Sequence, residues 1–287
     1  MFKKTYPPFL GAFLLLLGFK GFSQDIVEPN RYTASNKGKL FVSWGGNRAG
    51  FTKSDITFKG EDYDFTIKNV TAHDKPKGWH IDYINPARMT IPQTNFKLGY
   101  FISDKYTVSI GLDHMKYVMD NNKNRELDGY INLPSDATGS IYNGVYDNQN
   151  FFVSEEFLKF EHTDGLNYIY AEIARYDDIS SLFRIQNTDK FQVNITEGIG
   201  AGVLFPKTNT TLLGKDRYDQ FHVSGFGVSL SAGLNLTFFK HFFIQGDLKG
   251  GYINMGNIRT THNSADSASQ HFFYKQRVIS LGGIFRV

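Results

Sequence analysis

The chain has 287 residues, a formal net charge of +3 and no cysteine, while Phe, Tyr and Gly are abundant at 27, 16 and 28 residues. The lack of cysteine excludes disulfide scaffolds, lipoproteins and cysteine-based metal or nucleophile chemistry, and mixed charges without a basic block exclude nucleic acid as a partner. Aromatic residues and glycine in these amounts favour strands and tight turns over helices.

The first 23 residues have the pattern of a secretory signal peptide. Two lysines precede an apolar run over 9–19, and small residues follow at Gly21 and Ser23. A membrane-anchoring helix needs about 20 apolar residues, and this run is too short for one. The sequence therefore predicts a signal peptide over 1–23, cleaved after Ser23, and export across the inner membrane.

Beyond the signal, apolar residues recur at every second position and not at helical spacing. The clearest run is 223–239, where the apolar side chains from Phe226 to Phe238 share one face and Gly, Ser, Asn and Thr share the other. Strands of soluble proteins usually have about five to six residues, whereas a tilted membrane strand needs about 9–11. The 13 alternating positions from Phe226 to Phe238 favour a strand that faces lipid.

Eight such strands are expected, joined by connections of alternating length. Bacterial outer-membrane barrels have short periplasmic turns and longer outer loops, and a closed barrel leaves no strand edge unpaired in hydrocarbon. The sequence thus predicts an all-β fold: a transmembrane antiparallel up-and-down β-barrel over 39–287, preceded by a periplasmic segment at 24–38. The expected strands are 39–53, 94–103, 105–118, 166–176, 191–205, 222–237, 241–258 and 271–287.

Two further segments leave the count of eight open. Residues 55–70 and 151–162 have strand-like composition, and they either extend neighbouring strands above the membrane or add a hairpin that makes ten or more strands. Their polar residues interrupt any continuous lipid-facing side, so extension is the favoured interpretation.

Charged residues on the inward-facing side predict a polar network in the lumen. The interior of an eight-stranded barrel is just wide enough for side chains to fill, and a desolvated charge is costly unless it is paired. We therefore expect a structural plug; a proton or ion path is the alternative, and 12 or more strands would make an open pore. The inward charged residues are Lys97, Asp113, Glu172, Asp247 and Lys249.

Glu197 falls on the predicted lipid-facing side of its strand, where a carboxylate costs free energy at mid-depth. The adjacent glycines of 198–202 predict a β-bulge that shifts the register and turns Glu197 inward.

One connection carries a candidate catalytic group. His262 and Ser264 lie two residues apart in the last expected outer loop, and Asp266 is near enough in sequence to orient the histidine. The spacing resembles that of outer-membrane barrels that remove acyl chains from lipid A. In those enzymes an asparagine follows the serine on a barrel strand, whereas here Ala265 follows in a polar loop. A surface loop without a catalytic role is the favoured interpretation, and a lipid A acyl hydrolase is the alternative.

The C-terminus carries a second resemblance. Ser280 and Gly282, followed by Phe285 and Val287 two positions apart, resemble the terminal strand signal of outer-membrane barrels. The resemblance implies recognition by the machinery that inserts barrels. The last residue of that signal is usually aromatic, and Val287 departs from the pattern.

At the level of pattern, the whole mature chain is similar to small outer-membrane β-barrel proteins of the Bacteroidota. Cleavage after Ser23 leaves Gln24 as the first residue of a chain rich in glycine and aromatic residues. The resemblance implies a place in the cell outer membrane, surrounded by its lipid, and it implies no activity.

The two longest connections, 54–93 and 119–165, are the expected place of function, because loops on a rigid scaffold often carry binding residues. The first mixes charges with aromatic residues expected to be exposed, such as Tyr63 and Phe65. The sequence predicts a barrel that presents these loops to glycans or other envelope proteins, or that serves as an accessory subunit of an envelope complex. A narrow channel is a further alternative. The scattered histidines predict no metal site, and no cofactor is expected.

Overall fold

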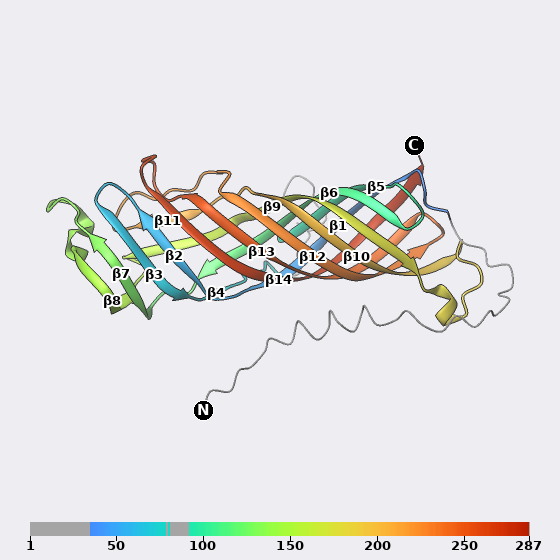
Figure 1. Cartoon of the computed structure of the whole chain (residues 1–287), viewed down its shortest axis with the longest axis horizontal. Helices are drawn as coiled ribbons and strands as arrows, with labels where there is room; N and C mark the ends of the chain where they lie inside the picture. The colour runs from blue at the N-terminus through green and yellow to red at the C-terminus, as the bar shows by residue number, and fades with distance from the viewer. Residues whose placement is uncertain (1–34, 79, 81–91, 287) are drawn as a thin grey trace, which may run out of the picture. The chain divides into compact units, whose positions relative to one another are not determined.

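The computed structural model describes residues 35–78, 80 and 92–286. The signal peptide expected over 1–23 and the first part of the 24–38 segment lie outside these residues. The described residues form fourteen strands and two short 3-10 helices (Figure 1). None of their helices is long and apolar enough to cross a membrane.

Eight of the strands close into one antiparallel ring, in which the last strand pairs with the first. Each of the eight segments expected from the sequence supplies one ring strand, so the prediction of an eight-stranded antiparallel barrel is confirmed. In ring order, the strands are β1(Lys39–Phe51), β5(Thr94–Phe101), β6(Tyr106–Met119), β9(Leu158–Asp178), β10(Phe191–Leu204), β12(Gly225–Phe238), β13(Phe242–Arg259) and β14(Ser267–Arg286).

The strands are tilted, because the ring closes with a register shift. A path that crosses the strands at right angles from Val42 returns to the chain at Thr52, just past the end of β1 and ten residues further along. Eight strands with a shift of this size tilt by roughly 40° and leave an interior that side chains fill. The path passes Leu98, Ile110, Ala171, Ala201, Val228, Tyr252 and Phe273.

The ring is polar inside and apolar outside. On β12, Leu230 is 51% exposed, whereas its neighbour Ser229 is 3% exposed and faces the lumen. The same alternation puts Ile110 and Ile279 outside and Asn235 inside. A soluble barrel has the opposite arrangement, so this wall has the surface of a transmembrane barrel.

Three connections lie at one end of the ring, together with the C-terminal end of β14, and two of them are tight turns. They join β5 to β6, β9 to β10 and β12 to β13, and η4(Ser180–Phe183) lies in the second. Residues 35–38 are held at this end by Asp104 in the β5–β6 turn. Its Oδ1 accepts hydrogen bonds from the Ser35 hydroxyl at 2.9 Å and from the amides of Asn36 and Lys37 at 2.8 and 2.9 Å.

Because Asp104 holds residues 35–38, removal of its carboxylate should make this segment easier to cleave. The Lys37 amide, the Ser35 hydroxyl and the Asn36 amide hold the pKa of Asp104 below its ordinary value, so this contribution to stability is present at neutral pH and is lost as the pH falls through the lowered pKa. We expect Asp104→Ala to accelerate trypsin cleavage after Lys37 in the detergent-folded protein. Asp177→Ala, at the same end of the ring, is the control, and equal cleavage rates in all three proteins would contradict the anchoring role.

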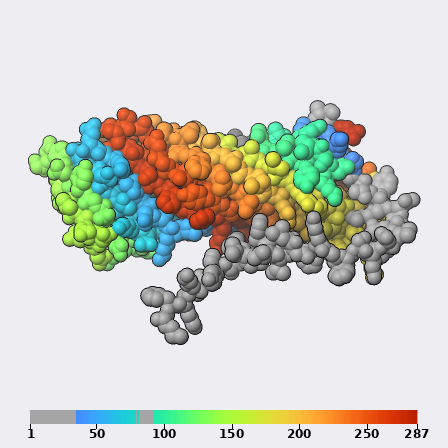
Figure 2. Space-filling view, in the orientation of Figure 1, coloured from blue at the N-terminus to red at the C-terminus, as the bar shows by residue number. Residues whose placement is uncertain are grey.

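At the other end, four strands continue the sheet beyond the ring. We call β2(Ser54–Lys59), β3(Tyr63–Val70), β7(Lys123–Ile131) and β8(Gly144–Val153) the outer extension. It begins on β14, whose residues 267–270 pair with β2 while the residues from Tyr274 onward pair with β1. Figure 2 shows the surface of β14, in red, next to the part of the outer extension that is drawn in blue. The strands β4(Ala72–His73) and β11(Asn209–Leu212) pair with the outer ends of β6 and β9.

The hydrophobic core of the outer extension continues into the outer end of the ring, where the ring centroid of Phe160 on β9 lies 5.7 Å from that of Phe58 on β2. Phe157 is fully buried, and its ring centroid lies 5.7 Å from that of Phe65, 4.6 Å from that of Phe151 and 5.0 Å from that of Tyr142. Tyr63 and Phe65, which the sequence analysis expected to be exposed, are 0% and 1% exposed. That expectation is wrong because β2 and β3 pack one apolar face against the residues that precede β9. The favoured interpretation of 55–70 and 151–162 as extensions agrees with this arrangement.

The bulge expected at Glu197 is also absent. The register of β10 with β9 and β12 runs through this residue without a shift, and Glu197 faces outward with Ile195 and Ile199. Its partner on β9 is Arg175, which is itself opposite Tyr106, the first residue of β6. On β12, Glu197 is opposite Ala232, the middle residue of the apolar run from Phe226 to Phe238, so its carboxylate lies within the apolar wall beside the oppositely charged Arg175.

Candidate functional site

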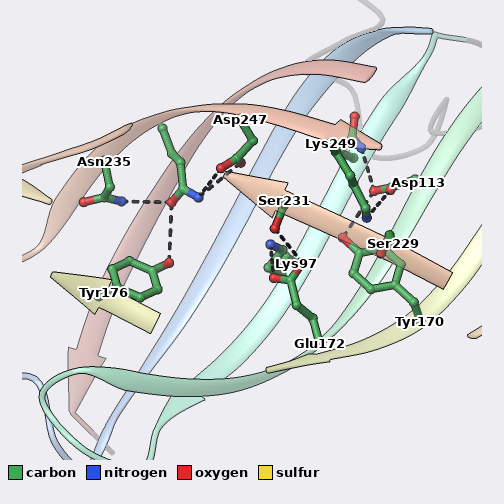
Figure 3. Close-up of polar contacts among 12 residues, drawn as sticks. Lys97, Asp113, Tyr170, Glu172, Tyr176, Ser229, Ser231, Asn235, Asp247 and Lys249 are labelled. Carbon is green, nitrogen blue, oxygen red and sulfur yellow. Dashed lines mark hydrogen bonds and ion pairs between the residues drawn. The ribbon is translucent and has the colours of Figure 1, made fainter. Parts of the chain in front are cut away.

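The lumen collects charged side chains from four ring strands. Lys97 comes from β5, Asp113 from β6, Glu172 from β9, and both Asp247 and Lys249 from β13. Residues two apart on a strand share a face, so strict alternation along each strand turns all five toward the barrel axis. Figure 3 shows them together with the neighbouring hydroxyl and amide groups.

Two ion pairs join these charges across the ring. Lys97 Nζ lies 2.5 Å from Glu172 Oε1, and Lys249 Nζ lies 2.5 Å from Asp113 Oδ2. The second pair is the more buried, because its side chains are 4% and 1% exposed. Lys249 Nζ also lies 3.5 Å from the centroid of the Tyr170 ring, which gives the ammonium group a cation–π contact.

Neutral polar groups complete the network. Asp113 accepts hydrogen bonds from Asn95 Nδ2 at 2.6 Å and from the Tyr170 hydroxyl at 3.3 Å. Gln245 Nε2 donates to both oxygens of Asp247, at 2.9 and 3.1 Å, and Gln245 Oε1 accepts from Asn235 Nδ2 at 3.0 Å. Asp113 thus has three donors, counting Lys249, and both oxygens of Asp247 are bound by Gln245, which lowers the cost of burying these charges.

The space left between these side chains is small. The cavity lined by the network has a volume of about 30 Å³, and a single water needs roughly 10–15 Å³. The interior at this level therefore has room for one or two waters. This geometry is that of a filled barrel.

The structure does not bring the candidate catalytic residues together. The Asp266 carboxylate is 1% exposed and binds Lys215 Nζ at 2.8 Å and the Thr261 hydroxyl at 2.7 Å. His262 is exposed and its ring packs against Tyr218, with centroids 5.5 Å apart, while the carbonyl of the exposed Ser264 accepts from Arg259. Asp266 thus holds the base of the β13–β14 loop to the β11 region.

The C-terminal residues lie on the last ring strand. Ser280 and Gly282 face the lumen, where Gly282 lies under the Phe243 ring, and Phe285 faces outward with 41% of its surface exposed. Val287 lies outside the described residues. Within residues 35–78, 80 and 92–286, no group of three or more His, Asp or Glu side chains is placed to hold a metal ion.

The far end of the outer extension presents an open strand edge. β8 is the last strand in the sheet order and pairs on one side only, with β7. Close to this edge, Ile141 is 79% and Val145 83% exposed, and Phe152 is 54% exposed. This edge was not expected because 119–165 was assigned to a loop, and β7 buries only Leu127 and Ile131, so its sequence has no run of alternating apolar residues.

Beside this edge is an open pocket of about 420 Å³. It lies between the connection that contains η3(Thr138–Tyr142) and the turn after β11, which binds the Asp266 carboxylate through Lys215. The pocket walls combine apolar and charged groups. They are formed by Leu133, Ala137, Thr138, Leu213, Gly214, Lys215 and Asp216.

No family model matches the chain, and no curated protein matches it. Among solved structures it is similar to Ail, the attachment invasion locus protein of Yersinia pestis, at 11% identity and a TM-score of 0.33, covering 87% of this chain and 99% of Ail. It is similar to the outer membrane protein OprG from Pseudomonas aeruginosa at 10% identity and a TM-score of 0.36, covering 88% and 98%. Neisserial surface protein A matches at 8% identity and a TM-score of 0.33, covering 86% and 99%.

Proposed function

We propose that this protein is an outer-membrane barrel whose outer extension binds another envelope protein along the free edge of β8. The observation that carries the proposal is the one-sided pairing of β8 beside the exposed side chains of Ile141, Val145 and Phe152. An unpaired strand edge is a template for a further strand, and strand addition is a common mode of peptide recognition. Exposed apolar side chains at such an edge supply contact area for the added strand.

The placement in the outer membrane is supported by the wall and by the sequence. The outward apolar side chains match a lipid surface, and the tight β5–β6 and β12–β13 turns at one end match periplasmic turns. The expected signal peptide supplies the route to this membrane, and the outer extension then faces the cell exterior. Origin in a Bacteroidota envelope stays a prediction of the sequence.

The filled lumen favours an anchoring role for the ring over a channel. Both lysines of the network are bound to carboxylates at 2.5 Å, and moving an ion through would require these buried pairs to separate. Removing one partner from a buried pair costs several kcal/mol. The ring is accordingly proposed as a support for the extension.

Site-specific photo-crosslinking in intact cells tests the β8 proposal. A crosslinker at Val145 should give one adduct of discrete mass, and Ile141→Asp in the same chain should reduce its yield about fivefold, because a charge beside the edge must be desolvated on binding. The control position is Leu182, which is 76% exposed near the opposite end of the ring. The proposal fails if Val145 gives no adduct in cells where the barrel is folded and membrane-embedded.

A further inference from the structure

The free strand β8 lacks the residues that often protect a sheet edge. Within the part of the chain that the structure describes, β8 pairs with β7 alone, and it is the fourth strand of the sheet beyond β14. Exposed edges often carry lysine or proline, whereas the β8 sequence GVYDNQNFFV has neither and carries one charge, at Asp147. Figure 1 shows this strand at the far end of the outer extension. The edge is therefore open to a further strand.

A bulge in the middle of β8 places its two exposed apolar side chains on one face. The β7–β8 register shifts between Leu127 and Gly129, where Asp128 is opposite two residues of β8. Side chains seven positions apart lie on opposite faces of a regular strand, and the extra residue of the bulge reverses this for Val145 and Phe152. Both point away from the core, with 83% and 54% of their surfaces exposed. The outer face of the edge thus has an apolar side chain near each end.

The inner face of β8 has the same arrangement. Tyr146 and Phe151 lie next to the two exposed residues in sequence, and their rings contact each other with centroids 5.6 Å apart. Both pack, partly buried, against the core of the outer extension. Between these two aromatic residues, the strand has only Asp147 and three amide side chains. β8 is thus apolar at both ends and polar in the middle.

This order of side chains makes β8 complementary to a second copy of itself. In an antiparallel pair that places Val145 opposite Phe152 of the second copy, a β-branched residue contacts an aromatic one, which is a favourable cross-strand pair. The next position inward places Tyr146 opposite Phe151, an aromatic pair on the other face. A two-fold axis repeats each contact, so each of these apolar pairs forms twice.

The middle of the strand favours the same register. Asp147 lies opposite Asn150 of the second copy, so the one charge of β8 is beside an amide donor and no like charge. A shift by one residue puts the outer face of one copy against the inner face of the other. A shift by two residues places Val145 opposite Asn150 or Ser154 and removes its contact with an aromatic residue. One antiparallel register therefore pairs apolar with apolar and polar with polar side chains.

We infer that the strand added to β8 is β8 of a second copy of this chain, and that the protein forms a two-fold dimer through its outer extension. The inference rests on the proposed function, because it names the envelope protein that binds the free edge. The exposed side chains of Val145 and Phe152 become covered in the pair, and the unpaired backbone groups of both edges bind each other. Since each copy has then used its free edge, the dimer is closed and does not grow into a longer sheet.

Oxidative crosslinking of single-cysteine variants tests the dimer and its register, because the chain has no cysteine of its own. Directly opposite residues of antiparallel strands have Cα atoms about 4.5–5.5 Å apart, which is within the range of a disulfide. In the inferred register, Val145 of one copy lies about 24 Å from Val145 of the other, since seven residues of about 3.4 Å separate them. We therefore expect a mixture of detergent-folded Val145→Cys and Phe152→Cys proteins to give at least about tenfold more disulfide-linked dimer than either protein alone.

A mixture of the Val145→Cys and Leu182→Cys proteins is the matched control, because Leu182 is 76% exposed near the opposite end of the ring. It should give only the small yield of chance collisions. Charge gives a second test of the register. Asn150→Asp, introduced into both the Val145→Cys and the Phe152→Cys protein, places carboxylates opposite each other and should lower the dimer yield about fivefold, whereas Asn150→Lys should keep the yield.

The inference is overturned if the Val145 and Phe152 variants, each with a heat-modifiable band, give no more dimer together than the Leu182 control. The photo-crosslinker at Val145 in cells then decides the proposed function separately. An adduct whose mass is not twice that of the chain keeps the proposed function and overturns the dimer. The absence of any adduct removes both.

Discussion

Lys249→Met is expected to destabilise the barrel by about 3–5 kcal/mol, because it leaves the Asp113 carboxylate buried without its counterion. Lys249 is 4% and Asp113 1% exposed, so water cannot replace the ammonium group without entering the packed lumen. The Asn95 and Tyr170 donors to Asp113 remain, and they keep the loss within this range. Urea unfolding of the barrel in detergent, followed by the heat-modifiable gel shift, measures the change.

The double variant Lys249→Met with Asp113→Asn is the matched control. It removes both charges at nearly constant volume, and replacing a buried pair by neutral groups is often close to neutral in free energy. We therefore expect the double variant to recover most of the stability lost in Lys249→Met. If the double variant loses the sum of the stability that Lys249→Met and Asp113→Asn lose separately, the ion pair contributes no coupling and the interpretation is wrong.

Phe157→Ala is expected to destabilise the outer extension by about 3–5 kcal/mol, the usual cost of removing a buried phenylalanine ring from a core. The ring is fully buried and contacts Phe65, Phe151 and Tyr142, all of which lie outside the eight-stranded ring. We expect faster proteolysis of the extension, measured by limited digestion and mass analysis, while the barrel keeps its heat-modifiable shift.

The control for Phe157→Ala is Phe239→Ala, in the β12–β13 turn, where the ring is 65% exposed. It should change neither the digestion of the extension nor the gel shift. Loss of the gel shift in Phe157→Ala would show that the extension and the ring unfold together. The extension would then not be a separate packed unit.

The ring strands could be predicted because a membrane strand must alternate between apolar and polar residues over its whole length. Each must alternate over more than about nine residues, and the run from Phe226 to Phe238 does so without a break. The inward position of Lys97 or Asp247 follows from the same alternation. The ion-pair partners do not follow from the alternation. Lys97 contacts Glu172 and Lys249 contacts Asp113 because of the ten-residue register shift, which no local pattern encodes.

The outer extension could not be predicted because alternation does not say which medium the apolar face contacts. Residues 63–70 alternate like a ring strand, yet Tyr63, Phe65 and Ile67 pack against protein. The error at Glu197 has a related cause. Its outward position was counted correctly, but the sequence could not show that Arg175 is its partner on β9.

The position of β14 has a consequence for assembly. This strand pairs with β1 along its C-terminal part, with β2 at its N-terminal end and with β13 along nearly its whole length. Until it is in place, the ring has two open edges and the β2–β3 hairpin has no ring strand to rest on. The twenty residues of β14 thus complete the membrane wall and dock the outer extension in one event, so a chain that lacks this strand loses both.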